Sequence, residues 1–204
     1  MGSFMEIFTL VTGVIYIILE IRQKNFMWVI GVITSLAAMW VFWRQNLFAS
    51  FGLNTYYLIT AFIGLWQWNR DKKKVRQDST DVAGPDMIHL NRLTLKTMVI
   101  SLIVTVAGIL GLAWLMELVE NPMSYLDSAV TVLSAVATWW LVRSYIQQWW
   151  LWILADTLST ILCAVQGMWW MTALYAAYAL SAAYGYVHWK KHGVYVLEKE
   201  EERL

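Results

Sequence analysis

Apolar and polar residues follow one another along this chain in long blocks. Seven apolar blocks come close to the roughly 20 residues that a helix needs to cross a bilayer, with about 17 to 25 acceptable. We place the spans at Phe4 to Ile21, Phe26 to Trp43, Ser50 to Trp68, Thr97 to Leu118, Tyr125 to Tyr145, Trp149 to Gln166 and Gly167 to His188. The pattern predicts an all-α integral membrane protein.

One polar segment separates the third span from the fourth. From Asn69 to Arg92 it holds ten charged residues in 24, with Gly84 and Pro85, which predicts a hydrophilic loop. The chain then divides into a first three-helix bundle at 1–68, a charged loop at 69–92, a linker helix at 93–119, a second three-helix bundle at 120–189 and a tail at 190–204.

The two three-helix blocks are related by an internal repeat. Residues 8–71 align without a gap with residues 129–192 at a constant offset of 121, with nine identities in 64 positions. The identical pairs are Val11/Val132, Arg22/Arg143, Trp28/Trp149, Gln45/Gln166, Leu53/Leu174, Tyr57/Tyr178, Ala61/Ala182, Gly64/Gly185 and Trp68/Trp189. Many membrane transporters are built from such repeats. Because one span separates the triplets, we expect the repeats to be parallel, with a pathway between them.

Composition supports a membrane protein and charge gives its direction. Apolar residues make up 59% and charged residues 14%, whereas a soluble domain carries about a quarter charged. With seven spans, 14 of the 15 basic residues lie on the side of the C-terminus and only Arg44 lies opposite. The positive-inside rule therefore predicts a cytoplasmic loop and tail and an external N-terminus. We expect the chain to lie in the cytoplasmic (inner) membrane of a bacterium.

Several classes of function are excluded or disfavoured. The net charge is +1 and the basic residues form short juxtamembrane clusters, so no nucleic-acid partner is expected. Cys163 is the only cysteine, which excludes an intrachain disulfide and a cysteine-built metal site. No Walker or zinc-protease motif and no intramembrane Ser/His or paired-Asp arrangement is present, so we expect no enzyme, cofactor or metal. The segment that follows Met1 to Ser3 lacks the features of a signal peptide.

Polar side chains recur at helical spacing on several spans, and Asp156 is the most informative of them. A carboxylate within a span costs about 2.5 to 3.5 kcal/mol unless it faces protein, water or a partner, so it is by default a functional residue. The alternatives are a structural network of hydroxyls around Asp156, or a protonated carboxyl. For Glu20, near a span end beside Arg22, a structural role is at least as plausible, and Asp127 reads as a solvated helix start.

Aromatic and histidine residues mostly have simpler explanations than a ligand. Ten of the 14 tryptophans lie near predicted span ends, and an aromatic belt is the better explanation for most of them. These ten are Trp28, Trp43, Trp66, Trp68, Trp114, Trp149, Trp150, Trp169, Trp170 and Trp189. Trp152 lies further in and shares a helix face with Asp156, an arrangement that suits an aromatic cation. We interpret His89, His188 and His192 as solvated loop residues.

These residues resemble a known family, the Pnu-type vitamin transporters. The resemblance is carried by the run from Leu19 to Asn25 with Trp28 and Gly31, the run Gly64 to Trp68, the run Gln148 to Trp152 with Asp156, and the segment Tyr175 to Trp189. It implies two parallel three-helix bundles joined by a linker helix, as in SWEET sugar transporters, and usually a homotrimer. It also implies facilitated diffusion, with the vitamin trapped by a cytoplasmic kinase that need not touch the transporter.

The same resemblance divides members into nicotinamide riboside, thiamine and riboflavin types. This chain departs from the nicotinamide-riboside pattern at Val29, where proline is usual, at Thr138, where an amide is usual, and at Asp156, where asparagine is usual. Together with Glu20, these departures favour thiamine, because the amino group of its aminopyrimidine ring can donate a hydrogen bond directly to a carboxylate. Nicotinamide riboside, and less so riboflavin, are the alternatives, and a non-transporting sensor or scaffold is the alternative from another class.

The predicted substrate site combines residues from both repeats. Its predicted members are Asp156, Trp152, Thr138, Asn54, Tyr57, Tyr178 and, from the first span, Glu20.

Overall fold

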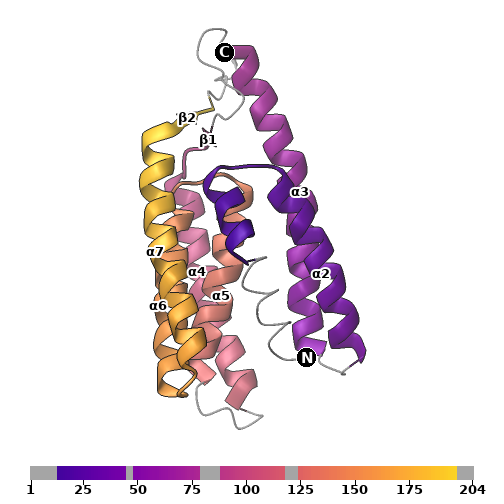
Figure 1. The fold of residues 1–204 in the computed structure, drawn as a ribbon, viewed down its shortest axis with the longest axis vertical. Helices are drawn as coiled ribbons and strands as arrows, with labels where there is room; N and C mark the ends of the chain where they lie inside the picture. Colours follow the sequence, from indigo (N-terminus) through magenta and orange to yellow (C-terminus); the bar gives the residue numbers. More distant parts are fainter. Residues whose placement is uncertain (1–12, 45–47, 79–87, 118–123, 197–204) are drawn as a thin grey trace. The chain divides into compact units, whose positions relative to one another are not determined.

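Seven helical segments and one pair of short strands make up the described part of the chain. The computed structural model describes residues 13–44, 48–78, 88–117 and 124–196. Residues 13–21 are helical. After them come α2 (Phe26–Arg44), α3 (Phe48–Asp78), β1 (Ile88–Leu90), α4 (Leu95–Glu117), α5 (Ser124–Val142), α6 (Gln148–Val165), α7 (Trp169–His192) and β2 (Gly193–Tyr195), as Figure 1 shows.

The helices lie where the apolar blocks predict them. Apart from the far end of α3, every described helix end is within four residues of its predicted position. Among the described residues, three stretches have both the length and the apolar content of a membrane span: Leu95–Glu117, Tyr125–Val142 and Gln148–Val165. Phe26–Trp40 is apolar but shorter. The start of the first predicted span, at Phe4, lies outside the described residues.

The segment predicted as a hydrophilic loop is partly regular structure. Helix α3 continues ten residues past Trp68, to Asp78, and β1 lies near the end of the same segment. The prediction of a loop over 69–92 is therefore wrong at both of these places. The reason is that a drop in hydropathy marks the end of a span and not the end of a helix, since Lys, Arg and Gln are good helix formers.

A parallel strand pair modifies the predicted all-α architecture. β1 pairs with β2 in the register Ile88↔Gly193, His89↔Val194 and Leu90↔Tyr195, and Val196 N donates to Leu90 O at 2.8 Å. All three residues of β1 are buried. A segment of the central loop is thus held against the chain just after α7.

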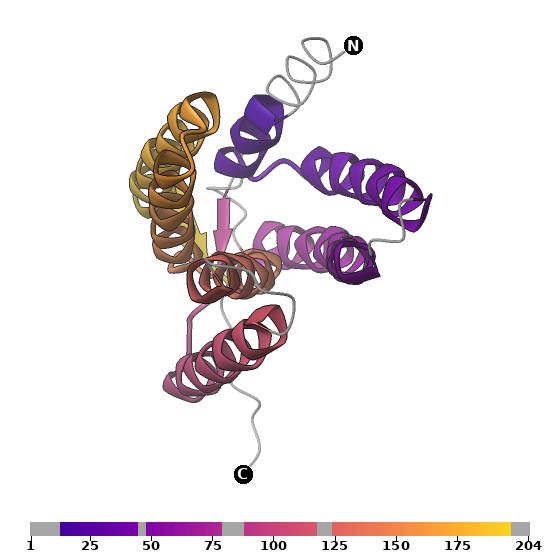
Figure 2. The same cartoon turned by 90° about the horizontal axis from the view of Figure 1, so that it is seen from below.

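The chain divides into two compact units. The first contains the described residues up to Asn91, together with Val142–Ser144 and those from Lys191 on, and within it α2 packs along α3 (Figure 1). The second contains Arg92–Leu141 and Tyr145–Lys190. Within it α4 lies beside α5 at the edge of the unit (Figure 2), and Trp140 Nε1 donates to Ser101 Oγ at 3.0 Å. Most of α4 is exposed, as suits a helix that faces lipid or another apolar surface.

Two turns at equivalent positions of the repeats have the same geometry. Gln23 follows the first helix with φ 47°, and Ser144, 121 positions later, follows α5 with φ 55°. In each turn the backbone N–H of the next residue donates to the carbonyl five residues earlier. Lys24 N donates to Leu19 O at 2.8 Å, and Tyr145 N donates to Trp140 O at 3.0 Å. This is the Schellman ending of a helix, here with a non-glycine residue in the left-handed conformation. The internal repeat is therefore visible in backbone detail.

Tryptophan and glycine pack tightly in the first unit. Trp28 and Trp68 are fully buried and meet edge to face, with ring centroids 5.0 Å apart and planes at 76°. Gly64 leaves room for the Trp28 ring, because a Cβ at this glycine would lie 2.5 Å from the indole. The prediction that Trp28 and Trp68 belong to an aromatic belt is wrong: they are core residues.

The second unit repeats this cluster at the equivalent positions. Trp149 and Trp189 are buried, with centroids 5.3 Å apart and planes at 89°, and a Cβ at Gly185 would lie 2.5 Å from the Trp149 ring. The belt prediction is wrong for this pair too. Six other predicted belt residues are exposed, as a belt requires: Trp43, Trp66, Trp114, Trp150, Trp169 and Trp170. Three of the nine identities of the repeat, Trp28/Trp149, Gly64/Gly185 and Trp68/Trp189, are thus explained by one packing motif.

Candidate functional site

Asp156 is the centre of an acidic and aromatic cluster in the second unit. It lies on α6 with only 9% of its surface exposed, and its carboxylate acts electrostatically on the hydroxyls of Tyr175 and Tyr178 on α7. The two tyrosine rings meet edge to face with centroids 6.0 Å apart. Ser159 and Cys163 continue the buried face of α6. The polar face of this span therefore packs against protein, and two of the predicted site residues, Asp156 and Tyr178, interact electrostatically within this cluster.

Trp152 and Thr138 are the other predicted site residues of the second unit. Trp152 is half-buried one turn before Asp156, and its indole N–H is buried without a hydrogen-bond partner among the described residues. Thr138 on α5 is buried, and its hydroxyl donates to Ser134 O on its own helix at 2.8 Å. The Trp152 N–H thus remains available to a ligand as a donor, whereas Thr138 can offer only oxygen lone pairs.

A second acidic and aromatic cluster lies in the first unit. Glu20 is buried at the end of the first helix, and Glu20 and Tyr57 both act electrostatically on Tyr16. Tyr56 and Tyr57 have ring centroids 5.6 Å apart. Asn54 is half-buried on α3, one turn before Tyr57. Each unit therefore has its own carboxylate with tyrosines around it.

Tyr16 and Tyr175 belong to these clusters, although the predicted site omits them. The offset of 121 was the signal that could have found Tyr175, because it maps Tyr175 onto Asn54, a predicted site residue. Tyr16 precedes Glu20 by four residues and so lies on the same helix face. Helical spacing from the carboxylate was therefore sufficient to add Tyr16.

The side chain of Gln23 holds β1 in a buried polar cluster. Its Nε2 donates to His89 O at 2.9 Å, and His89 N donates to its Oε1 at 2.7 Å. The same Nε2 lies 3.3 Å from Ser144 Oγ, its counterpart in the other repeat. One amide side chain thus pairs with both backbone groups of a buried strand residue, so neither group is buried without a hydrogen bond.

His89 is fully buried, so its prediction as a solvated loop histidine is wrong. Its Nε2 is 3.0 Å from Ser144 Oγ, and its ring stands edge-on to Trp68 with centroids 5.8 Å apart. Its Nδ1 is buried without a hydrogen-bond partner among the described residues. Burial, and to a smaller degree the charge of Lys72, lower the pKa of His89 from 6.5 to about 3. The imidazole is therefore neutral at physiological pH.

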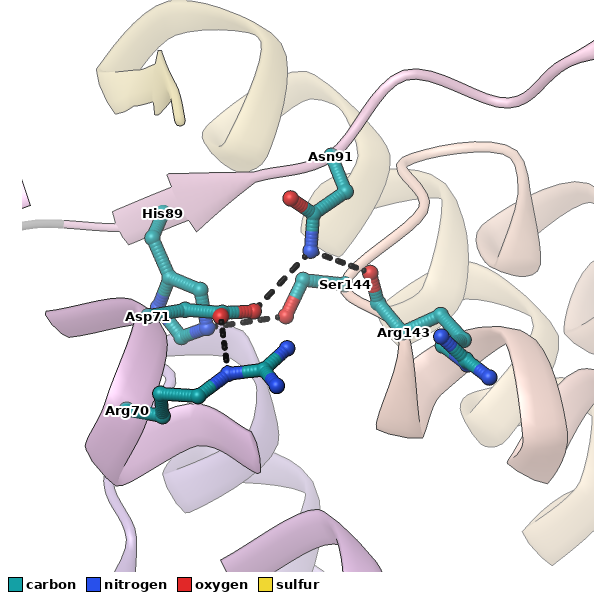
Figure 3. A network of polar contacts seen from close by, with 6 residues as sticks. All are labelled: Arg70, Asp71, His89, Asn91, Arg143 and Ser144. Carbon is teal, nitrogen blue, oxygen red and sulfur yellow. Dashed lines mark hydrogen bonds and ion pairs between the residues drawn. The ribbon is translucent and has the colours of Figure 1, made fainter. Parts of the chain in front are cut away.

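Asn91 joins the same cluster to two further segments (Figure 3). Its Nδ2 donates to Asp71 Oδ2 at 3.1 Å and to Arg143 O at 2.8 Å, and its backbone N donates to Ser144 O at 3.2 Å. The Arg143 side chain points away. Lys72 Nζ donates to Gln23 O at 2.6 Å. We call this group the polar hub, and its members are Gln23, Asp71, Lys72, His89, Asn91 and Ser144.

The chemistry of the three clusters differs. The polar hub has its donors and acceptors paired almost completely with one another, which suits a structural role. The clusters around Asp156 and Glu20 combine a buried carboxylate with tyrosine rings, which suits an aromatic cation. Among the described residues, no group of three or more His, Cys, Asp or Glu side chains is arranged to hold a metal ion.

Comparison with known proteins identifies similar chains over almost the whole length. The model of a family described as nicotinamide mononucleotide transporter matches residues 3–191. The nicotinamide riboside transporter PnuC of Haemophilus influenzae is 26% identical over 190 residues, which cover 93% of this chain and 80% of that protein. The PnuC protein of Escherichia coli, with the same description, is 24% identical over 203 residues, covering 92% and 85%.

A solved structure is similar as well. The crystal structure of the vitamin B3 transporter PnuC superposes with a TM-score of 0.61 at 22% sequence identity, covering 89% of this chain and 78% of that one. This likeness shows a shared fold.

Proposed function

The chain belongs to the nicotinamide mononucleotide transporter family, and from this premise we propose that it carries nicotinamide riboside across the membrane by facilitated diffusion. It is a membrane transporter, and its family is one of transporters and not of enzymes. The named relatives in Haemophilus influenzae and Escherichia coli are nicotinamide riboside transporters, which supports this substrate over thiamine.

The observation that carries the proposal is the buried carboxylate of Asp156 beside Tyr175 and Tyr178. The pyridinium ring of nicotinamide riboside is planar and carries a fixed positive charge. A carboxylate out of contact with bulk water attracts this charge strongly, and the faces of tyrosine rings attract it further. The unpaired indole N–H of Trp152, one turn away, can donate to an oxygen of the substrate.

Uptake becomes one-way through chemistry on the cytoplasmic side. Facilitated diffusion alone only equalises the two concentrations. A cytoplasmic kinase that phosphorylates the riboside adds negative charge, and a carboxylate-centred site such as that of Asp156 repels an anion. The kinase and the transporter are thus coupled through the shared metabolite and need no contact.

Thiamine is the second candidate, and the two buried acids favour it. Both Asp156 and Glu20 are less than one-tenth exposed. Thiamine is also an aromatic cation, and its aminopyrimidine can donate a hydrogen bond to a carboxylate. Taken alone, such residues favour thiamine. The named relatives favour nicotinamide riboside instead, because their similarity extends over 93% and 92% of the chain and does not rest on single positions.

Binding to the purified protein separates the two candidates. We expect nicotinamide riboside to bind the wild type, and Asp156→Asn to bind it at least about tenfold more weakly, because a buried charge loses its partner. Asp127→Asn removes the same charge in the first turn of α5 and is the matched control, with unchanged affinity. Binding of thiamine alone would establish the second candidate. If Asp156→Asn binds nicotinamide riboside as tightly as the wild type does, the proposed substrate is still correct but Asp156 is not part of the binding site.

A further inference from the structure

The end of α3 has two different faces. One face is buried: Gly64 receives the Trp28 ring, Trp68 is fully buried, and Asp71 accepts a hydrogen bond from Asn91. These residues recur at intervals of three or four, so they form one stripe along the helix. The packing of α3 against the polar hub thus determines which side of the helix is left facing outward.

The opposite face is aromatic and basic. Trp66 is 62% exposed, and the guanidinium of Arg70, one turn further on, lies 4.8 Å from the centre of its ring. Lys73 and Lys74 are exposed one more turn along. The spacing of four, seven and eight residues from Trp66 places all of them on one side of the helix. We call Trp66, Arg70, Lys73 and Lys74 the basic stripe.

Charged groups around the basic stripe leave it positive. Among the described residues, the carboxylate that pairs with it is that of Asp71, whose Oδ1 lies 3.5 Å from Arg70 Nε. Asp71 is itself buried, and its other oxygen accepts from Asn91. Lys72 points elsewhere, to Gln23 O. Arg70, Lys73 and Lys74 are all exposed, so this side of the helix carries three positive charges beside the buried negative charge of Asp71.

The basic stripe lies at the boundary between the apolar and charged parts of α3. The last apolar residue of the predicted span is Trp68, and the charged extension begins at Arg70. Exposed tryptophan is typical of the level of the lipid headgroups, and Lys or Arg just beyond a span attracts anionic headgroups. We propose that the basic stripe binds the phosphate of an anionic phospholipid, with Trp66 against the acyl and glycerol region. Binding of a free phosphate ion would not account for the exposed Trp66 ring.

Thermal unfolding of the full-length protein in detergent, with added lipid, tests this proposal. Phosphatidylglycerol should raise the unfolding temperature by about 3 °C, whereas phosphatidylcholine with the same acyl chains should not. Lys73→Gln/Lys74→Gln should lose most of this rise. Lys190→Gln/Lys191→Gln is the control. It removes two exposed lysines from a turn of α7 that has no exposed tryptophan, and it should keep the rise in unfolding temperature.

Native mass spectrometry gives a second readout. The wild type should retain phosphatidylglycerol, and Lys73→Gln/Lys74→Gln should retain at least about fivefold less at the same lipid concentration. The proposal is wrong if both double variants respond alike, if phosphatidylcholine stabilises as well, or if inorganic phosphate reproduces the rise. None of these outcomes bears on the transported substrate, so failure here is distinct from failure of the proposed function.

Discussion

At the scale of single residues, the two glycines opposite Trp28 and Trp149 show what the internal repeat preserves. Gly64 and Gly185 are identical residues at equivalent positions, and each lets an indole ring lie against the backbone of its helix. The ring cannot retreat, because each indole is held edge-on by a second buried tryptophan. The repeat therefore preserves a packing motif.

Alanine at either glycine should destabilise the protein. The added Cβ would lie 2.5 Å from the indole, and such overpacking costs about 1 to 3 kcal/mol. We expect Gly64→Ala and Gly185→Ala each to lower the temperature of thermal unfolding by about 5 °C. Gly52→Ala and Gly111→Ala are the controls, since nothing lies within 4 Å of a Cβ there, and they should be neutral or slightly stabilising. Equal behaviour of the two pairs would contradict this account of the motif.

The sequence identifies these residues better than it identifies their roles. The offset of 121 selects Trp28, Gly64 and Trp68 together, but a tryptophan near a span end is equally typical of a lipid-facing belt and of a buried contact. Only the packing partner distinguishes a buried tryptophan from a lipid-facing one. For Trp28 that partner is Gly64, which lies 36 residues further along the chain. Asp156 stands out from the sequence alone, because a carboxylate in an apolar span is exceptional wherever its partners lie.

At the scale of elements, helix positions follow from the sequence and the polar hub does not. Apolar runs locate the span ends, since the bilayer sets their length. They do not show that α3 continues to Asp78, because charged helix formers extend a helix as well as apolar ones do. β1 has only three residues and is held by Gln23, 66 positions earlier. No local pattern contains that information, so His89 looked like a loop residue.

Burial of neutral His89 predicts a pH dependence of stability. Its folded pKa of about 3 lies below the ordinary value of 6.5, so between these values the unfolded chain binds a proton that the folded protein does not. Stability is therefore complete above about pH 6.5 and falls below it, by up to about 1.4 kcal/mol per pH unit from this group. Denaturant unfolding of the wild type and of His89→Asn, between pH 6.5 and 4.5, measures the difference.

We expect a shallower slope for His89→Asn than for the wild type over this range. His192→Asn, at an exposed histidine at the end of α7, should keep the wild-type slope. Parallel curves for His89→Asn and the wild type would mean that His89 is protonated in the folded protein, against the buried geometry described above.

At the scale of the whole molecule, the family shows that the chain is a membrane transporter, and the charge pattern predicts its orientation. The predicted arrangement of parallel bundles, with 14 of 15 basic residues on one side, makes a topology that can be tested independently of the substrate. The sequence separates the two candidate substrates poorly, because thiamine and nicotinamide riboside are both aromatic cations. Single positions such as Asp156 suit either of them.

Cysteine labelling in intact cells tests the topology. In a Cys163→Ala background, Arg44→Cys should react with a membrane-impermeant maleimide from outside. Lys74→Cys and Lys191→Cys should react only after permeabilisation, because the positive-inside rule places both in the cytoplasm. Labelling of Lys191→Cys in intact cells would reverse the orientation.

Uptake into proteoliposomes tests the central claim most directly. Vesicles that contain the purified protein should take up labelled nicotinamide riboside without any ion gradient until the inner and outer concentrations are equal, and preloading with unlabelled riboside should accelerate the entry. An excess of unlabelled riboside should strongly reduce the initial rate of label uptake, and the same excess of thiamine should not. Uptake no faster than in protein-free vesicles, or uptake that requires a sodium or proton gradient, would contradict facilitated diffusion of nicotinamide riboside by this chain.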